Sequence, residues 1–237
     1  YEAAAARAVV QDGDRDLLMI EAMCHSLAAA DYASAVALLE RHAMDLVMQG
    51  YVKTVGGWVA AIPGDWEDAQ PRTHLALAWM HLLRGAYAEA APHLRLAQRA
   101  ISEGGDGAGN AVLAEWLVMQ SLLRYMEGMP LESRSLAQRA LATAPADDRR
   151  VRGLAHYALG SALQRLGDLD GARVSYRVAL KDSRAAQNLV AEMLSTVGVG
   201  AMAVERGRLH EAHQIATATL ERAAQSGTLP PILAVIH

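Results

Sequence analysis

The sequence predicts an all-α protein, an α-solenoid in which helical hairpins stack into a superhelix. Alanine accounts for 48 of the 237 residues, aromatic residues make up only 5%, and Phe is absent. This composition favours helices that pack closely through small side chains, and it disfavours a β-sandwich, a barrel or a disordered chain. The second observation is a turn motif that occurs five times, with intervals of 43, 39 and 40 residues between its last four copies.

Each copy of the motif places a small residue or Gly before an apolar residue, and the copies begin at Ala30, Gly85, Gly128, Gly167 and Gly207. Gly readily adopts the left-handed conformation that ends a helix, and a following Asp or Pro favours the start of the next one. The turns therefore predict antiparallel helix pairs. Helices are expected before the turns at 17–29, 73–84, 110–127, 150–166 and 190–206, and after them at 32–48, 87–102, 130–143, 169–187 and 208–225.

We expect one helical-repeat domain over residues 1–237, as a piece of a larger protein. Residues 1–70 form an irregular first part, because the first interval is 55 residues long and 51–62 supplies an additional short helix that Pro63 and Gly64 end. Regular repeats follow over 71–227, and a further apolar helix starts over 228–237. An apolar end on a solenoid is typical of a chain that continues.

Charge and cysteine content restrict the class of protein. The formal net charge is -4 and the sequence pI is about 6.1, so binding to DNA or to anionic lipid through a broad basic surface is disfavoured. The single cysteine, Cys24, allows no internal disulfide, and no signal peptide or membrane span is visible. These features predict a cytoplasmic protein that contacts neither membrane nor nucleic acid directly.

Motifs for catalysis and for metal or cofactor binding are missing from the sequence. Neither Lys53 nor Lys181 follows Gly in a Walker A pattern, so no P-loop is present. His210 and His213 lack a third zinc ligand at the usual spacing, and Cys24 is expected to be a buried, inert thiol in an apolar helix. We therefore predict no catalytic residue, no metal site, no cofactor and no enzymatic activity for this region.

The repeats resemble tetratricopeptide repeats, in which a small residue of the first helix packs against a small and an aromatic residue of the second. Gly160, Gly167, Ala172, Tyr176 and Ala179 match that pattern. The last copy departs from it, because Ala216 replaces the aromatic residue and the period near 40 exceeds the standard 34. The resemblance implies a right-handed superhelix of helical hairpins.

The first hundred residues are similar to a more specific family, the large ATP-dependent LuxR-type regulators of the MalT-like group. The resemblance rests on the segments 26–36, 38–43, 58–63, 75–79 and 85–90 in that order and spacing. In that family a STAND-type NTPase precedes the superhelix and a helix-turn-helix domain follows it. The resemblance therefore implies a sensor region that binds a small-molecule inducer or a regulatory protein and couples it to assembly, including self-association, and to DNA binding by other domains. The alternative is a tetratricopeptide scaffold that binds proteins and no small ligand.

The resemblance also places a candidate ligand site, because the first helix of each tetratricopeptide hairpin lines the inner surface. Counting from each turn predicts the groove residues Trp79, Glu115, Leu122, Tyr125, Tyr157, Ser161, Gln164, Arg165 and Glu205. Aromatic faces mixed with polar groups are typical of sites for sugars and amphipathic ligands. Trp79 and Tyr157 could instead fill gaps between hairpins, and Gln164 and Arg165 could be solvated. Tyr157, Ser161 and Gln164 share one helix face by their spacing.

Overall fold

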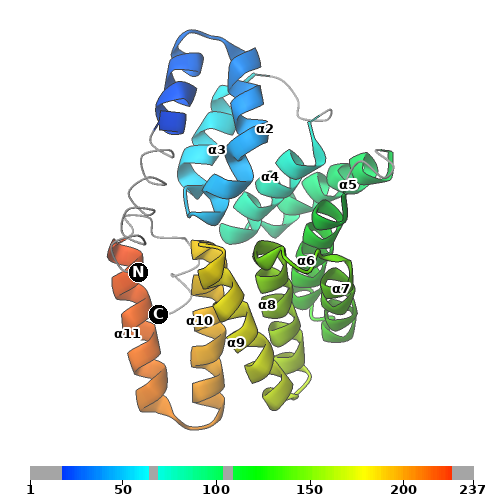
Figure 1. Ribbon diagram of the computed structural model, residues 1–237, viewed down its shortest axis with the longest axis vertical. Helices are drawn as coiled ribbons and strands as arrows, with labels where there is room; N and C mark the ends of the chain where they lie inside the picture. Colours follow the sequence, from blue (N-terminus) through cyan, green and yellow to red (C-terminus); the bar gives the residue numbers. More distant parts are fainter. Residues whose placement is uncertain (1–17, 64–68, 104–108, 226–237) are drawn as a thin grey trace.

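The computed structural model describes residues 18–63, 69–103 and 109–225, and helices are the regular secondary structure in these ranges (Figure 1). A first helix over 18–28 precedes the labelled ones. The others are α2 (Tyr32–Met48), α3 (Val52–Ala61), α4 (Pro71–Leu83), α5 (Tyr87–Glu103), α6 (Gly109–Met126), α7 (Pro130–Thr143), α8 (Arg149–Arg165), α9 (Leu169–Ala185), α10 (Leu189–Glu205) and α11 (Leu209–Gln225). The predicted fold class is confirmed, and within the described ranges each expected helix begins and ends within two residues of its predicted bounds.

Local sequence explains where the helices begin and end. Gly167 and Gly207 have φ values of 83° and 69°, the left-handed region that ends α8 and α10. At the next helix start, Asp168 Oδ1 accepts a hydrogen bond from the backbone N–H of Gly171 at 2.9 Å, which caps α9. Asn188 caps α10 in the same way through the N–H of Ala191 at 3.0 Å. Gln187, just before this cap, adopts the left-handed conformation although it is not Gly, with a φ of 51°.

The helices form hairpins that pack on one another along the chain. α4 pairs with α5, α6 with α7, α8 with α9 and α10 with α11, and each hairpin also contacts the next. The last two hairpins have the same helix lengths and lie exactly one period apart, since α8 and α9 repeat as α10 and α11 with an offset of 40 residues. This register allows residues of the two hairpins to be compared position by position.

The solenoid curves enough for distant helices to touch. α2 contacts α10, and the side-chain Nε2 of Gln49 donates to the carbonyl oxygen of Gln187 at 2.9 Å (Figure 1). One hydrophobic cluster of the described residues extends from Met19 through Trp79 and Leu154 to Leu194. The first part of the chain and the regular repeats therefore share a core.

Cys24 is exposed, so the expectation of a buried thiol is wrong; Met23 beside it is the residue of that helix that is fully buried. The further helix expected over 228–237 lies outside the described residues, and the division of the chain into one domain stays a prediction. Within the described ranges, no helix combines the length and the apolar character that crossing a bilayer requires.

Candidate functional site

A cavity of about 100 Å³ lies where four successive hairpins meet. Its aromatic residues are Trp79 on α4, Tyr87 at the start of α5, Tyr125 on α6 and Tyr157 on α8. The rest of its wall is apolar and comprises Leu82, Leu83, Leu122, Met126 and Leu194. Because the first helices of all four hairpins contribute to it, the cavity exists only when the hairpins are stacked.

Trp79, which lines this cavity, also has an unsatisfied hydrogen-bond donor. The side chain is 1% exposed, and its indole N–H has no hydrogen-bond partner within the described part of the chain. Trp116, by comparison, donates its indole N–H to the carbonyl oxygen of Leu94 at 3.0 Å. Buried donors without an acceptor are rare and cost free energy, which makes the Trp79 N–H a point where a bound acceptor would be favoured.

Other polar groups border the cavity. Burial raises the pKa of Tyr157 to about 12, so at neutral pH its hydroxyl stays protonated and can both donate and accept hydrogen bonds. The guanidinium carbon of Arg165 lies 5.2 Å from the centre of the Tyr125 ring, a cation–π contact that holds a positive charge beside this aromatic residue. The site therefore combines ring faces with a few groups that can orient a ligand.

Residues 114–237 match the model of a protein family described as the MalT-like TPR region, where TPR denotes the tetratricopeptide repeat. The match covers more than half of the chain. It includes the helices α8 to α11 and the cavity-wall residues of α6, α8 and α10. The chain belongs to this family. It is accordingly a regulatory helical region of a MalT-type regulator. No curated protein matches the sequence.

The structure of this MalT-like region brings five of the predicted groove residues together. Trp79, Leu122, Tyr125 and Tyr157 line the cavity, and Arg165 contacts Tyr125. These five come from three different helices, α4, α6 and α8. Their convergence supplies a candidate ligand site for the MalT-like region.

Ser161 and Gln164 instead take part in a cluster organised by Tyr176 of α9. The Tyr176 hydroxyl lies 3.3 Å from Ser161 Oγ and donates to Gln164 Oε1 at 2.9 Å. The ring of Tyr176 also lies against that of Tyr157, with centroids 5.9 Å apart. The shared face of Tyr157, Ser161 and Gln164 therefore packs at least partly against the second helix of its own hairpin.

The two predicted acidic residues lie apart from the cavity wall. Glu115 is 1% exposed, and its two carboxylate oxygens accept from the guanidinium of Arg150 at 2.6 and 3.3 Å. This buried ion pair joins α6 to α8, and both oxygens of the Glu115 carboxylate are bonded to a side chain of the protein itself. Glu205 is exposed at the last position of α10.

The sequence reasoning missed five residues of the cavity wall, and they are Leu82, Leu83, Tyr87, Met126 and Leu194. Four of them lie next to the hairpin turns, where the spacing of apolar residues predicts burial without indicating which hairpin they contact. The position of Tyr87 directly after the turn at Gly85 is the one signal that could have found an additional aromatic residue.

Three histidines of α4 and α5 form a separate cluster. The rings of His81 and His93 stack with centroids 5.5 Å apart, and the Nδ1 atoms of His74 and His93 are 3.4 Å apart. Burial, followed by the neighbouring rings of His81 and His74, lowers the pKa of His93 to about 4. Among the described residues, no group of three or more His, Cys, Asp or Glu is placed to hold a metal ion.

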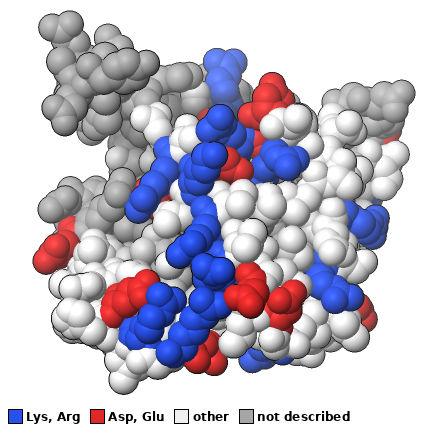
Figure 2. Space-filling view, turned by 60° about the horizontal axis from the view of Figure 1, so that its bottom comes forward, with Lys and Arg blue, Asp and Glu red and all other residues white. Residues whose placement is uncertain are grey.

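Charged residues gather on one face of the molecule. Figure 2 shows a column of Lys and Arg side chains on one face of the molecule, with Asp and Glu beside it. Ion pairs of the described residues include Arg184 with Glu192 at 2.9 Å and Arg208 with Glu211 at 2.8 Å. Arg177 on α9 is exposed and does not line the cavity, so it offers a control position for binding experiments.

Proposed function

We propose that this region senses an effector for a MalT-like transcriptional regulator by binding a small-molecule inducer at the cavity beside Trp79. The observation that carries the proposal is the unpaired, buried indole N–H of a residue that lines an aromatic cavity. An inducer that supplies an acceptor to this N–H gains a hydrogen bond without displacing one within the protein.

The chemistry of the wall supports a sugar or an amphipathic ring-bearing molecule. The faces of Trp79, Tyr87, Tyr125 and Tyr157 stack on sugar or aromatic rings, while hydroxyls and the Arg165 guanidinium fix orientation. A cavity of about 100 Å³ holds one ring-sized group rather than an entire drug-sized ligand. The rest of such a ligand would lie toward the outside of the site.

Coupling follows from the way the site is built. Because α4, α6, α8 and α10 all contribute to the wall, a ligand that bridges them favours one relative arrangement of the hairpins. Such a preference would change the assembly of the regulator and, through it, the DNA binding that other domains perform. The region itself takes no catalytic part in this proposal, uses no cofactor, contacts neither DNA nor membrane, and acts in the cytoplasm.

The competing function is a scaffold that binds a regulatory protein, or a second copy, and no small ligand. A thermal-shift screen with sugars, amino acids and aromatic metabolites separates the two, because a ligand that binds only the folded state raises Tm. The sensing proposal expects at least one compound to do so at millimolar concentration. If none of these classes raises Tm, the scaffold function is favoured and the inducer proposal fails.

The bound compound is then titrated by calorimetry against variants of the wall. Trp79→Phe keeps an aromatic ring but removes the N–H, and it should weaken binding about tenfold, the equivalent of one hydrogen bond. Tyr87→Ala serves as a second variant, because Tyr87 is 41% exposed and its truncation leaves the core intact. Arg177→Ala is the matched control and should bind as the unmodified chain does. Equal affinity of all three variants would contradict a site at this cavity.

A further inference from the structure

The cavity beside Trp79 has a positively charged group at its edge. Arg165 is the last residue of α8 and is exposed. Its guanidinium carbon lies 5.2 Å from the centre of the Tyr125 ring, and Tyr125 lines the cavity. Among the described residues, Arg165 forms no ion pair. The ring contact therefore holds the guanidinium next to the cavity while its charge has no counter-ion in the described part of the chain.

Carboxylates of the neighbouring helices do not compensate this charge. The described residues that line the cavity include no Asp or Glu. Glu115 of α6 and Glu127 at the end of α6 each pair with another Arg, at 2.6 and 2.5 Å. Glu205 of α10 is the counterpart of Arg165 one period of 40 residues later, and no ion pair joins the two. A negative charge at this cavity would therefore have to come from a ligand.

The polar groups at the cavity are mainly hydrogen-bond donors. The indole of Trp79 and the guanidinium of Arg165 can only donate, and the indole N–H has no partner within the described part of the chain. The hydroxyl of Tyr157, which lines the same wall, can also donate. Gln164 beside Arg165 offers an acceptor oxygen, but Tyr176 already donates to it at 2.9 Å. The groups left for a ligand thus favour one that is rich in acceptors.

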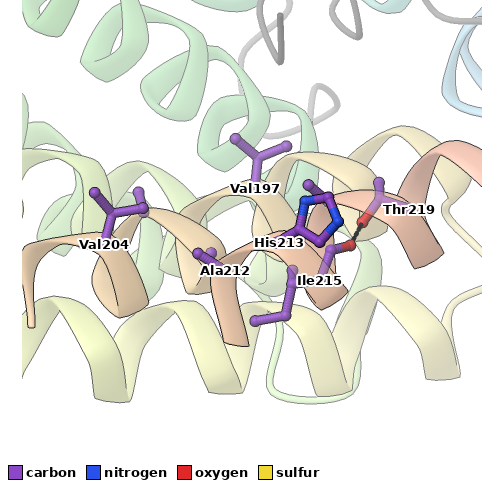
Figure 3. A pocket seen from close by; sticks show the side chains of 9 residues that line it. Val197, Val204, Ala212, His213, Ile215 and Thr219 are labelled. Atoms are coloured by element: carbon purple, nitrogen blue, oxygen red, sulfur yellow. Dashed lines mark hydrogen bonds between the residues drawn. The ribbon is translucent and has the colours of Figure 1, made fainter. Parts of the chain in front are cut away.

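A larger groove of about 340 Å³ between α10 and α11 lacks such a charge (Figure 3). Its wall is mostly apolar and includes Val197, Val204 and Ile215. The hydroxyl of Thr219 is bonded to the carbonyl oxygen of Ile215 at 2.6 Å. His213 is the ionisable side chain of this wall, and the described residues that line it include no Arg or Lys. This groove offers apolar surface but no fixed cation for an anionic ligand.

A third hollow contains a guanidinium whose charge is compensated within the protein. It has a volume of about 240 Å³ and lies between α9, α10 and α11, with Arg184 and Glu192 in its wall. The two side chains form an ion pair at 2.9 Å. Of these three hollows, the cavity beside Trp79 is thus the one that combines aromatic walls with an uncompensated cation.

We propose that the ligand of the cavity beside Trp79 is a small ring-bearing anion, a carboxylate or a phosphate monoester, whose anionic oxygens bind the guanidinium of Arg165. This inference rests on the proposed sensing function, because it assigns the ligand class of the same site. A guanidinium binds carboxylate and phosphate oxygens through paired N–H donors, and such charge-assisted hydrogen bonds are stronger than neutral ones. A neutral ring or sugar lacks this interaction.

The size of the cavity agrees with a charge at its edge. A volume of about 100 Å³ holds one ring, so the charged group of such a ligand lies outside the aromatic walls. Two residues of the wall, Tyr87 and Met126, are 41% and 48% exposed, so the cavity reaches solvent. An anionic group there keeps part of its hydration, which lowers the cost of binding a charge next to an apolar cavity.

Matched pairs of acidic and neutral compounds test the ligand class on the full chain. The pairs are benzoate with benzamide, phenyl phosphate with phenol, and glucose phosphate with glucose, each followed by thermal shift and calorimetry. We expect at least one acid to raise Tm and to bind about tenfold more tightly than its neutral partner. The carboxylate and phosphate pairs then show which anionic group the site prefers. The preference should fall as salt concentration rises, because salt screens the charge of Arg165.

Variants of Arg165 then test whether this residue provides the preference. Arg165→Gln removes the charge at an exposed helix end, so it should weaken binding of the acid about tenfold and leave binding of the neutral partner unchanged. Arg165→Lys keeps the charge without the paired donors and should retain part of the preference. Arg177→Ala, at an exposed position of α9 away from the wall, should bind both compounds as the unmodified chain does. Circular dichroism checks that each variant keeps its helix content.

Three results would overturn the proposal. Equal affinity for an acid and its neutral partner, with weaker binding in Trp79→Phe, would keep the sensing function and reject the anionic ligand. A preference for the acid that Arg165→Gln leaves unchanged would assign the anion to another cation of the protein. If no compound of any pair raises Tm, both the anionic ligand and the sensing function are rejected.

Discussion

A Cβ atom on Gly198 of α10 would lie 2.5 Å from two ring carbons of Tyr176 on α9. Gly160 of α8 stands on the other side of the same ring, where an added Cβ would come within 2.8 Å. The tyrosine ring is therefore enclosed between two glycines of the neighbouring helices. This contact sets how closely α8, α9 and α10 approach one another.

Gly198→Ala should destabilise the protein by about 1–3 kcal/mol, because the added methyl group forces the Tyr176 ring or the two helices to move. Urea denaturation followed by circular dichroism measures the change in the free energy of unfolding. Gly57→Ala is the control: a Cβ there meets nothing within 4 Å, and helix propensity predicts a gain of about 0.5–1 kcal/mol. If Gly198→Ala stabilised the protein as much as Gly57→Ala, the proposed packing would be wrong.

Tyr176→Phe isolates the hydroxyl of the same residue. The change keeps the ring between its glycines but removes the contacts to Ser161 and Gln164, so it should cost about 1 kcal/mol. Tyr176→Ala, which also removes the ring, should cost about 3–5 kcal/mol. The same denaturation experiment compares the two variants. Equal losses would show that the hydroxyl, and not the ring, provides most of the stabilisation.

Removing one partner of the Glu115–Arg150 ion pair should be strongly destabilising. Arg150→Met leaves the carboxylate of Glu115 buried at 1% exposure without its counter-charge, and we expect a loss of about 3–5 kcal/mol. The double variant Glu115→Met with Arg150→Met should be more stable than this single one, since no uncompensated charge remains. Glu205→Ala, at an exposed position, should change stability by less than about 0.5 kcal/mol. A double variant less stable than the single one would refute this account.

The histidine cluster predicts loss of stability as pH falls from about 6.5 to 4. The pKa of His93 in the folded protein is about 4, whereas an unfolded histidine has a pKa near 6.5, so in this range the unfolded chain binds more protons. Because the ring is partly accessible to solvent, we expect a contribution of about 1 kcal/mol. Free energies of unfolding measured between pH 7 and 4 should depend less on pH in His93→Gln. The exposed-site control His25→Gln should keep the full dependence; identical profiles for both variants would contradict the prediction.

The sequence by itself determined the helices, their order and their antiparallel pairing. These features depend on local chemistry: Gly167 and Gly207 end helices through their own backbone conformation, and Asp168 caps α9 three residues away. The period of the turns then indicates that successive hairpins stack. It also identified Trp79, Tyr125 and Tyr157 as aromatic residues of the first helices, which lie together at the cavity.

Only the tertiary structure decided which partners these side chains meet. Periodicity assigns a residue to a face of its helix, but the neighbour across that face depends on the stagger and curvature of the stack. Ser161 and Gln164 share a face with Tyr157, yet Tyr176 engages both of them because two glycines let the helices approach. Glu115 meets Arg150 35 residues away, and Gln49 meets Gln187 at a separation of 138. The second of these contacts follows from the accumulated curvature of many hairpins, a quantity that no local pattern encodes.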